Sequence, residues 1–339
     1  MKKYDGFVFG KLRIPCHVYQ DGVFSIDEII CRYNNSIDKA KPDPEYPYLT
    51  QELVDLIKPM VKQREEEAKA RGAPFFDGRQ VRLEGYGVDF ADEDEERKIL
   101  TIDFGPSTWF RYNATNKSLD TGAVEGNGRK ASIREKYVKD PLDLKDNLAN
   151  STGVSTTIIS SKDGRLLYVQ RSEKLSQYPA VFGDGAAGFM NRDKDLIKGV
   201  PNPFYTVMRE TKEEAGIPCK PEDFVLLGVG RAMDDLHGEI WMELRTNHTV
   251  DEIKGLPKSH KYETVRILDV PFEPKEVAKI FKEHLTAKEW EEKMKMWIDP
   301  EEYPQVPAWV PAHAVNTIHS LIKEYGFEPV RKAFEIEGL

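Results

Sequence analysis

Hydrophobic and polar residues alternate in several short runs in the second half of the chain, and this period-two pattern predicts strands. Residues 155–160 (STTIIS) and 166–172 (LLYVQRS) form two such runs. The turn residues Lys162-Asp163-Gly164 lie between them, so we expect the two strands to form a hairpin. The same pattern predicts later strands at 224–231, 239–245 and 261–270.

Residues 203–215 are predicted to form a helix with clear ends. Asn202 is a favourable cap, and Pro203 suits the first helical position. Gly216 followed by Pro218 is a stop signal. Apolar side chains within the segment are spaced so that they can face a sheet. Helical spacing elsewhere predicts helices at 50–71, 274–284, 288–297 and 309–326, and the last of these closes the fold.

The first half of the chain has a different organisation. Two strands are expected at 80–89 and 98–104, on either side of an acidic turn at 92–96. Pro59 is expected to kink the helix at 50–71 or to divide it in two, because proline lacks the amide hydrogen that an inner helical turn needs.

Two polar stretches separate this half from the second. Residues 120–135 are poor in apolar side chains, which predicts a long loop or linker, and residues 147–153 are a second polar stretch that leads into the hairpin. A chain of 339 residues has the size of two domains. We therefore expect a smaller α+β domain over 1–148 and a second domain over 149–339.

Three carboxylates lie close together on the predicted helix. Glu210, Glu213 and Glu214 stand at i, i+3 and i+4, a spacing that puts them on one helical face. Like charges at this spacing repel one another, so a cation is expected in front of them. Carboxylate oxygens suit a hard divalent ion, and we expect Mg²⁺ or Mn²⁺. Acidic runs without such flanking signals, at 65–67 and 93–96, are interpreted as solvated faces.

The same segment resembles the Nudix hydrolase family. The family signature is Gly-x5-Glu-x7-Arg-Glu-U-x-Glu-Glu-x-Gly-U, where U is a bulky and usually apolar residue. The hairpin and a glycine-rich loop at 185–189 precede the helix in the order typical of the family, and the resemblance spans roughly residues 150–325. The second half of the signature is matched by Arg209, Glu210, Thr211, Glu213, Glu214, Gly216 and Ile217, with threonine at a U position.

The first half of the signature departs from this pattern. Asp195 and Pro201 stand where the fixed spacing requires glycine and glutamate. The nearest suitable glycine is Gly188, which makes the loop seven residues longer than in the signature. The upstream glutamate has no clear equivalent, and Asp193 and Asp195 are the candidates to replace it.

The resemblance implies an α+β fold of the Nudix type, an α/β/α sandwich around a mixed sheet, preceded here by the smaller N-terminal domain. It implies divalent-metal-dependent hydrolysis of a diphosphate linkage in a small nucleoside diphosphate derivative, with Mg²⁺ or Mn²⁺ as cofactor. Phosphoryl transfer depends mainly on positioning and on charge neutralisation, which carboxylate-held metal ions supply. ADP-ribose, dinucleoside polyphosphates, nucleotide sugars and coenzyme-type diphosphates all remain open as substrates.

The resemblance also assigns roles to residues of the helix and the preceding loop. Glu210 and Glu214 are the expected direct metal ligands, and Glu213 is a further ligand or reaches the metal through water. Arg209 is expected to orient a glutamate, because a guanidinium is a cation with a rigid fork of donors. Gly188 is expected to let the loop backbone approach the helix or the phosphates.

Candidate residues also lie outside the helix. In the family a carboxylate from elsewhere often serves as general base, and Glu239 is the first candidate here, with Glu243 and Glu263 as others. Arg171 matches a familiar family position and is expected to bind a substrate phosphate. Trp241 is a candidate for stacking on a base.

His237 is a further candidate residue outside the helix. It lies in a loop rich in aspartate and glycine, and we interpret it as an exposed residue. The alternative is a role at a substrate phosphate or in proton transfer.

Composition limits the class of protein. Hydrophobic residues make up 40% and charged residues 32%, a soluble globular balance, and no apolar run is long enough to span a bilayer. The net charge of −9 argues against a general nucleic-acid binder. The chain starts without a secretory signal and its three cysteines have no metal-type spacing, so we expect a cytoplasmic protein with reduced thiols.

Two other functions use the same fold. An isopentenyl-diphosphate isomerase-like enzyme would need a cysteine in the active-site loop, and no cysteine lies between 150 and 218. A ligand-binding or regulatory protein with weak or no turnover is the stronger alternative, because the upstream glutamate is missing and the loop is stretched. The N-terminal domain could supply substrate specificity, a homodimer interface or a lid.

Overall fold

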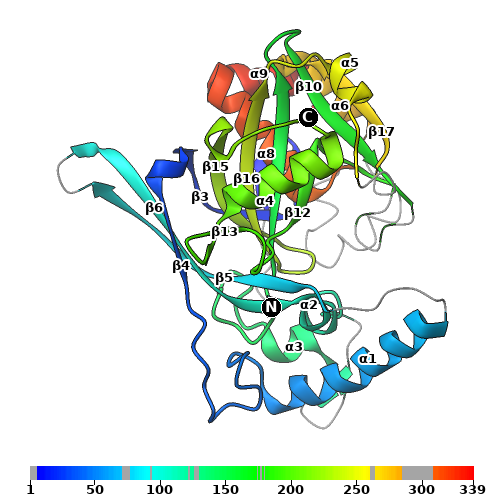
Figure 1. The fold of residues 1–339 in the computed structure, drawn as a ribbon. Coiled ribbons are helices and arrows are strands. Elements are labelled where there is room, and N and C mark those ends of the chain that lie inside the picture. Colours follow the sequence, from blue (N-terminus) through cyan, green and yellow to red (C-terminus); the bar gives the residue numbers. More distant parts are fainter. Residues whose placement is uncertain are drawn as a thin grey trace.

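The protein has an α+β fold in which a large mixed sheet lies between helices, above a smaller region with its own sheet (Figure 1). The computed structural model describes residues 6–70, 77–91, 94–120, 123–125, 130–173, 175, 178, 180–259, 264–284 and 308–339. Within these residues no helix is both long and apolar enough to cross a membrane.

The large sheet has eight strands in the order β11-β10-β9-β16-β15-β3, with β12 also beside β9 and β17 also beside β10. Strands β9 and β16 run parallel, and the other pairs are antiparallel. The sheet is therefore mixed, as expected. Its strands are β3 (Cys16–Phe24), β9 (Thr152–Ser160), β10 (Arg165–Arg171), β11 (Phe182–Asp184), β12 (Ala186–Phe189), β15 (Phe224–Ala232), β16 (Gly238–Thr246) and β17 (Thr264–Pro271).

The strands expected from alternation are confirmed, including the hairpin of β9 and β10. The strand expected at 261–270 is confirmed from residue 264 onward, and residues 261–263 lie outside the described part of the chain. One expectation is wrong. The glycine-rich segment 186–189 is not a loop but strand β12, because its backbone pairs with residues 153–156 of β9.

Helices cover both faces of this sheet, which explains why every residue of β9 is buried. Helix α4 (Pro203–Glu210) packs on one face through Phe204 and Val207. Helices α6 (Pro274–Glu283), α8 (Pro311–Tyr325) and α9 (Phe327–Glu337) belong to the core on the other face. The layers are helix, sheet and helix, and the expected closing helix is α8.

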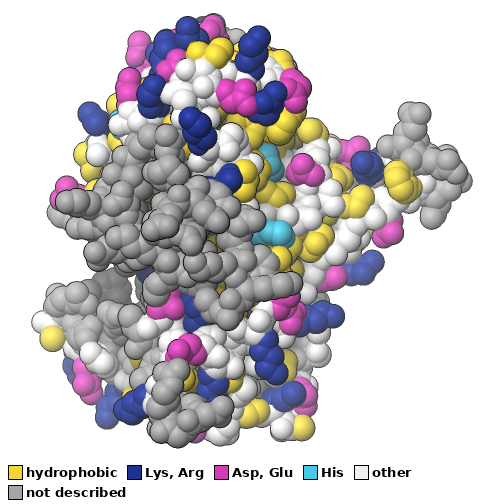
Figure 2. Space-filling view, turned by 180° about the vertical axis from the view of Figure 1, so that it is seen from behind, with side chains coloured by type: hydrophobic (Ala, Val, Ile, Leu, Met, Phe, Trp, Pro, Cys, Tyr) yellow, Lys and Arg dark blue, Asp and Glu magenta, His cyan; other side chains and the backbone are white. Residues whose placement is uncertain are grey.

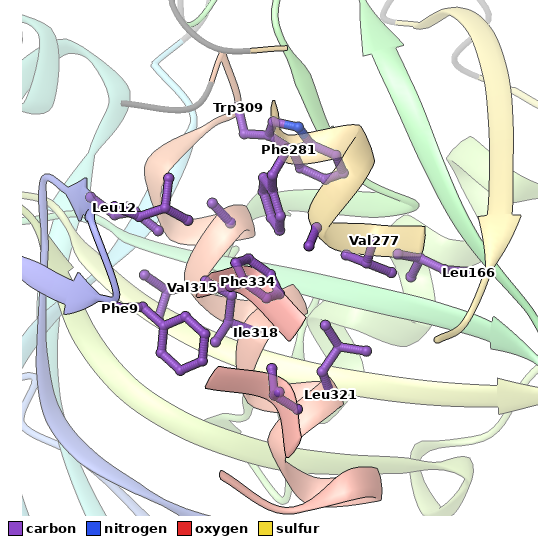
Figure 3. Close-up of a cluster of buried hydrophobic side chains, with 14 of the residues drawn as sticks. Phe9, Leu12, Leu166, Val277, Phe281, Trp309, Val315, Ile318, Leu321 and Phe334 are labelled. Carbon is purple, nitrogen blue, oxygen red and sulfur yellow. The ribbon is translucent and has the colours of Figure 1, made fainter. Parts of the chain in front are cut away.

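Figure 3 shows the core on the α8 side, where aromatic side chains from α6 and α9 meet aliphatic side chains of α8. Phe281, Phe334 and Ile318 are fully buried there, and Trp309 is 2% exposed. A buried side chain of this size stabilises the fold by about 1.5–3 kcal/mol. Hairpin β1 (Phe7–Phe9) and β2 (Leu12–Ile14) contributes to this same core.

The smaller region has a three-stranded sheet in the order β4-β6-β5. The expected strand pair around the acidic turn is confirmed as the hairpin of β5 (Arg79–Ala91) and β6 (Asp94–Thr108), with β4 (Ile29–Tyr33) parallel to β6. The described part of this hairpin includes an arm that stands away from the body, with hydrophobic and charged side chains mixed along it (Figure 2).

The helix expected at 50–71 is confirmed as α1 (Gln51–Ala70), and it continues through Pro59 without a break. Residues 120–135 are not simply a loop, because short elements interrupt them. Shorter elements that local pattern did not predict are η1 (Ile26–Glu28), α2 (Trp109–Thr115), β7 (Ala123–Glu125), β8 (Lys130–Ser132), α3 (Ile133–Tyr137), β13 (Leu196–Ile197), β14 (Val200–Pro201), η3 (Pro221–Asp223) and α5 (Val250–Gly255).

The two halves of the chain share one sheet. Strand β3 comes from the first 25 residues, yet it pairs with β15 of the later half over residues 16–24. The division into domains at residues 148 and 149 stays a prediction. Residues 16–24 are built into the sheet of the second unit, and the hairpin of β1 and β2 packs in its core. The helix expected at 288–297 lies outside the described residues.

A polar cluster lies beneath α8 in this otherwise apolar layer. Asp184 is 2% exposed and accepts hydrogen bonds from Asn316 Nδ2 at 2.7 Å and from Thr317 Oγ1 at 3.1 Å. Burial raises the pKa of the Asp184 carboxyl to about 7, although these hydrogen bonds favour the charged form.

This pKa predicts that stability falls as pH rises through the range between about 4 and about 7. In that range folded Asp184 holds a proton that the unfolded chain has released, so each pH unit removes up to about 1.4 kcal/mol of unfolding free energy. The variant Asp184→Asn cannot titrate and should lose this slope. Urea unfolding at pH 5 and pH 7.5 measures it.

The variant Asp251→Asn is the matched control, because Asp251 is 96% exposed and its loss should leave the slope unchanged. If Asp184→Asn kept the same change in unfolding free energy between the two pH values as the unmodified protein, the assigned pKa would be contradicted.

Candidate functional site

The site is built on a helix that begins after Asn202 and ends at Gly216, as the sequence predicts. The Asn202 side chain accepts a hydrogen bond from the Phe204 amide at 3.0 Å, and Pro203 is the first helical residue. The helix continues from α4 into a π-helical turn, η2 (Thr211–Ala215), and stops at Gly216 in the left-handed conformation. A π turn is wider than an α turn and is frequent at functional sites. It carries Glu213 and Glu214 at an angle to Glu210 that regular helix would not give.

Arg209 connects the acidic side chains of this segment. Its Nε and Nη2 donate to the two oxygens of Asp195 at 2.8 and 2.9 Å, a bidentate pair. Its Nη1 donates to Glu210 Oε1 at 2.6 Å and to Glu213 Oε2 at 3.3 Å. Burial disfavours the charged guanidinium, but these hydrogen bonds and carboxylates outweigh burial and raise the pKa of Arg209. Arg209 therefore contacts two glutamates of the helix, and its role in orienting them stays a prediction.

Asp195 is the buried anchor of this network. It is 1% exposed, and Thr206 Oγ1 and the Asn191 amide also donate to it, at 3.0 and 2.8 Å. Of the two candidates for the missing upstream carboxylate, Asp195 is the one that contacts the helix. Asp193 instead forms a half-exposed ion pair with Arg79 at 3.2 Å.

Glu210 lies directly against the backbone of β12. A Cβ atom at Gly188 would overlap Glu210 Oε1, so any larger residue would have to displace that carboxyl. The predicted close approach of Gly188 to the helix is therefore present. Burial raises the pKa of the Glu210 carboxyl to about 7, although the adjacent Arg209 opposes this change. Next to it, Glu214 Oε2 accepts a hydrogen bond from the Ala187 amide at 3.0 Å.

These residues have the donor chemistry of a hard-cation site but not its assembled geometry. In the described part of the chain no group of three or more His, Cys, Asp or Glu side chains is gathered to hold a metal ion. Glu210 and Glu213 are bonded to Arg209 instead. A buried carboxylate such as Glu210 gains from a nearby cation, and carboxylate oxygens suit Mg²⁺ or Mn²⁺. The metal assignment of Glu210, Glu213 and Glu214 stays a prediction.

A second buried cluster surrounds Glu239. Both ring nitrogens of His237 are hydrogen-bonded to carboxylates, Nδ1 to Asp235 and Nε2 to Glu239. His237 is 2% exposed, so its expected exposure is wrong. Burial disfavours the imidazolium, but the two carboxylates outweigh burial and raise the pKa of His237 well above its ordinary value. Tyr112 also donates to Asp235.

The two clusters lie on opposite faces of the sheet. Gly153 pairs with both Phe189 and Glu239, so these residues share one face, whereas the neighbouring Gly188 faces Glu210. The Phe189 ring is 5.7 Å from the His237 ring, and its carbonyl oxygen is 3.5 Å from Arg209 Nη2. The structure therefore does not bring Glu239 to the glutamates of the helix, and this placement does not support its role as general base.

Two other candidates, Trp241 and Glu243, serve the fold in this structure. Trp241 is fully buried beneath α8, where Gly228 and Gly230 leave room for its indole ring, so it offers no face to a ligand. Glu243 is 1% exposed and pairs with Lys323 at 2.7 Å. The burial of Trp241 does not support its role as a substrate contact. Glu263 lies outside the described residues.

Arg171 lies at the end of β10 and is half-buried. Its Nε donates to the carbonyl oxygen of Tyr178 at 3.2 Å, in the segment that precedes β11. Its role at a substrate phosphate stays a prediction.

Comparison with known proteins gives partial likenesses only. No family model and no curated protein matches the chain. A crystallised Deinococcus radiodurans protein matches at 15% identity and a TM-score of 0.31, over 43% of this chain and 82% of its own.

Two further solved structures have a TM-score of 0.28. A MutT/nudix family protein from Enterococcus faecalis matches at 17% identity, over 35% of this chain and 43% of its own. A bifunctional NMN adenylyltransferase/ADP ribose pyrophosphatase from Francisella tularensis, complexed with AMP and a manganese ion, matches at 12% identity, over 52% of this chain and 41% of its own. This chain thus spans less than half the length of either protein.

The contact between Gly188 and Glu210 predicts the effect of adding one methyl group. In Gly188→Ala the Cβ must displace the Glu210 carboxyl, and the adjacent Arg209 bond with it. We expect unfolding free energy to fall by about 1–3 kcal/mol, the usual range for overpacking. Gly87→Ala is the control, because no atom lies within 4 Å of a Cβ at that strand position. Equal stability of the two variants would contradict the described packing.

The His237 cluster makes a prediction about stability. Replacing the imidazolium in His237→Gln leaves the buried Asp235 and Glu239 without the cation that both contact. Removal of one partner from a buried ion pair costs about 3–5 kcal/mol. Denaturant unfolding at pH 7 measures this, with His248→Gln as control, since that ring is 37% exposed. A loss no greater than that of the control would argue against an ionised His237.

Proposed function

We propose that the chain is a divalent-metal-dependent hydrolase that acts on a diphosphate linkage in a small nucleoside diphosphate derivative. The observation that carries the proposal is the buried Glu210. It is held between Arg209 and the backbone at Gly188, on a helix that presents two further glutamates. Burying a carboxylate is unfavourable unless a cation compensates it. Arg209 compensates part of this charge through one oxygen of Glu210, and a divalent ion held by Glu210 together with Glu213 and Glu214 would compensate the rest.

Glu210, Glu213 and Glu214 are the residues proposed to hold the metal ion. A bound Mg²⁺ or Mn²⁺ supplies charge neutralisation for the diphosphate and a more acidic water. Arg209 fixes the direction of the Glu210 and Glu213 carboxylates through its two donors on Nη1. Glu214 is held by the Ala187 amide, so β12 and the helix keep a fixed separation at this point. Such positioning is the main contribution that a protein makes to phosphoryl transfer.

A ligand-binding or regulatory protein is the second candidate, and one observation favours it. The guanidinium of Arg209 already neutralises Glu210 and Glu213, so part of the expected metal site is satisfied without a metal ion. Such a protein would bind a nucleoside diphosphate derivative without cleaving it.

The test is hydrolysis of a substrate panel made of ADP-ribose, a dinucleoside polyphosphate, a nucleotide sugar and a coenzyme-type diphosphate. We expect turnover of at least one member with Mg²⁺ or Mn²⁺, and none after chelation, as measured by anion-exchange chromatography of the products. If no member is cleaved but one raises the melting temperature, the binding protein is favoured, because a ligand stabilises the state it binds.

The helix glutamates predict the effect of removing one charge. Glu214→Gln keeps the size of the side chain and an acceptor for the Ala187 amide, so folding should change little. We expect turnover to fall by about 100-fold or more, the scale seen when a group that stabilises the transition state is lost. Glu222→Gln is the matched control, since Glu222 is exposed and lies outside the helix. Full activity of Glu214→Gln would contradict its role.

A further inference from the structure

The stretched loop between β12 and α4 is attached to the N-terminal region at several points. The Arg192 amide donates to the carbonyl oxygen of Arg79 at 3.2 Å, and Asn191 forms an antiparallel bridge with Gln80. The Arg192 side chain reaches further, because its Nη2 donates to Tyr46 Oη at 2.9 Å. Residues of β5 and of the segment before α1 thus hold the loop from outside.

The same loop also holds Asp195, through hydrogen bonds with Asn191. The Asn191 amide donates to Asp195 Oδ2 at 2.8 Å, and the Asp195 amide donates to the Asn191 carbonyl oxygen at 3.0 Å. Arg192 bonds Tyr46, and its neighbour Asn191 bridges Gln80 and bonds Asp195. Hydrogen bonds and the peptide link between Asn191 and Arg192 therefore connect Tyr46 to Arg209.

Arg192 is held in an unusual environment for a cation. It is 8% exposed, and among the described residues no carboxylate forms an ion pair with it. Its guanidinium lies 5.7 Å from the Tyr46 ring centroid, and its Nε has no hydrogen-bond partner in the described part of the chain. A buried charge with incomplete pairing lowers stability, and proteins keep such features mainly where function requires them.

We propose that Arg192 is a positioning residue for the site, which ties the loop to the N-terminal region so that Asp195 holds Arg209, and through it Glu210, in place. This inference rests on the proposed function for its effect on rate, and on geometry alone for its effect on Arg209. It gives the seven extra residues of the loop a physical role, because a loop of ordinary length would have fewer residues with which to reach β5 and Tyr46. The N-terminal region is then part of the site.

The main test compares Arg192→Met with the unmodified protein. Loss of the outer attachment should lower kcat by about tenfold, because small misplacement of positioning groups has large effects on rate. KM should stay within about twofold, since Arg192 is not placed to contact substrate. Arg192→Lys keeps the charge and one donor and should restore part of kcat. Arg111→Met is the matched control, because Arg111 packs on the same Tyr46 ring but pairs with Asp43 and Asp77.

A double-mutant cycle separates positioning from general stability. Arg192 and Asp195 act along one path, so Asp195→Asn and Arg192→Met should together lower kcat by clearly less than the product of their separate effects. Independent effects that multiply would overturn the proposal. If Arg192→Met fails to fold, Tyr46→Phe removes only the phenol acceptor, and we expect a fall in kcat of about two- to fivefold.

A readout without turnover keeps this inference distinct from the proposed function. The Nε–H of Arg209 donates to Asp195 at 2.8 Å and should give a nitrogen–hydrogen NMR signal that exchanges slowly with water. In Arg192→Met this protection should drop by about tenfold, and in Arg111→Met it should not. Absence of hydrolysis in every protein, with this pattern of protection, would reject the enzyme and keep the positioning role. Unchanged protection in Arg192→Met would overturn the positioning role.

Discussion

The bidentate ion pair between Arg209 and Asp195 is the interaction on which the site depends. It places a full positive charge, 21% exposed on the side chain, between one buried aspartate and two glutamates of the helix. Without that charge, Glu210 would be a buried carboxylate packed against the backbone at Gly188 with no cation beside it. The close packing of β12 against the helix is therefore possible because the Glu210 carboxylate is paired with Arg209.

The same rule governs the other face of the sheet. Asp235 and Glu239 are buried there, and His237 stands between them as their shared cation. Strand β12 separates the two networks, with Gly188 facing Glu210 and the Phe189 ring facing His237. The sheet thus keeps two buried polar clusters on its opposite faces, on either side of strand β12.

Local pattern was sufficient for the elements that carry the site. The cap at Asn202, the stop at Gly216 and the period-two strands each depend on residues close in sequence, and each is present. The π turn was not predicted, because the spacing of residues 211–215 does not distinguish it from an α-helical turn. Strand β12 was missed because its pairing with β9 comes from residues some 30 positions earlier. The burial of His237 did have a signal, since carboxylates stand two residues before and after it.

The pairing of Arg209 with Asp195 could not be predicted from local sequence, because it depends on contacts between distant parts of the chain. Fixed spacing located no upstream glutamate, because the loop is longer than the signature and folds back on itself. Asp195 meets Arg209 only when that loop is held in place, and the residues that hold it are Arg79, Gln80 and Tyr46 of the N-terminal region. A longer loop has more conformational freedom to lose, so an external attachment is the physical requirement for using it at a site. The first half of the chain is thus needed for the geometry of the second.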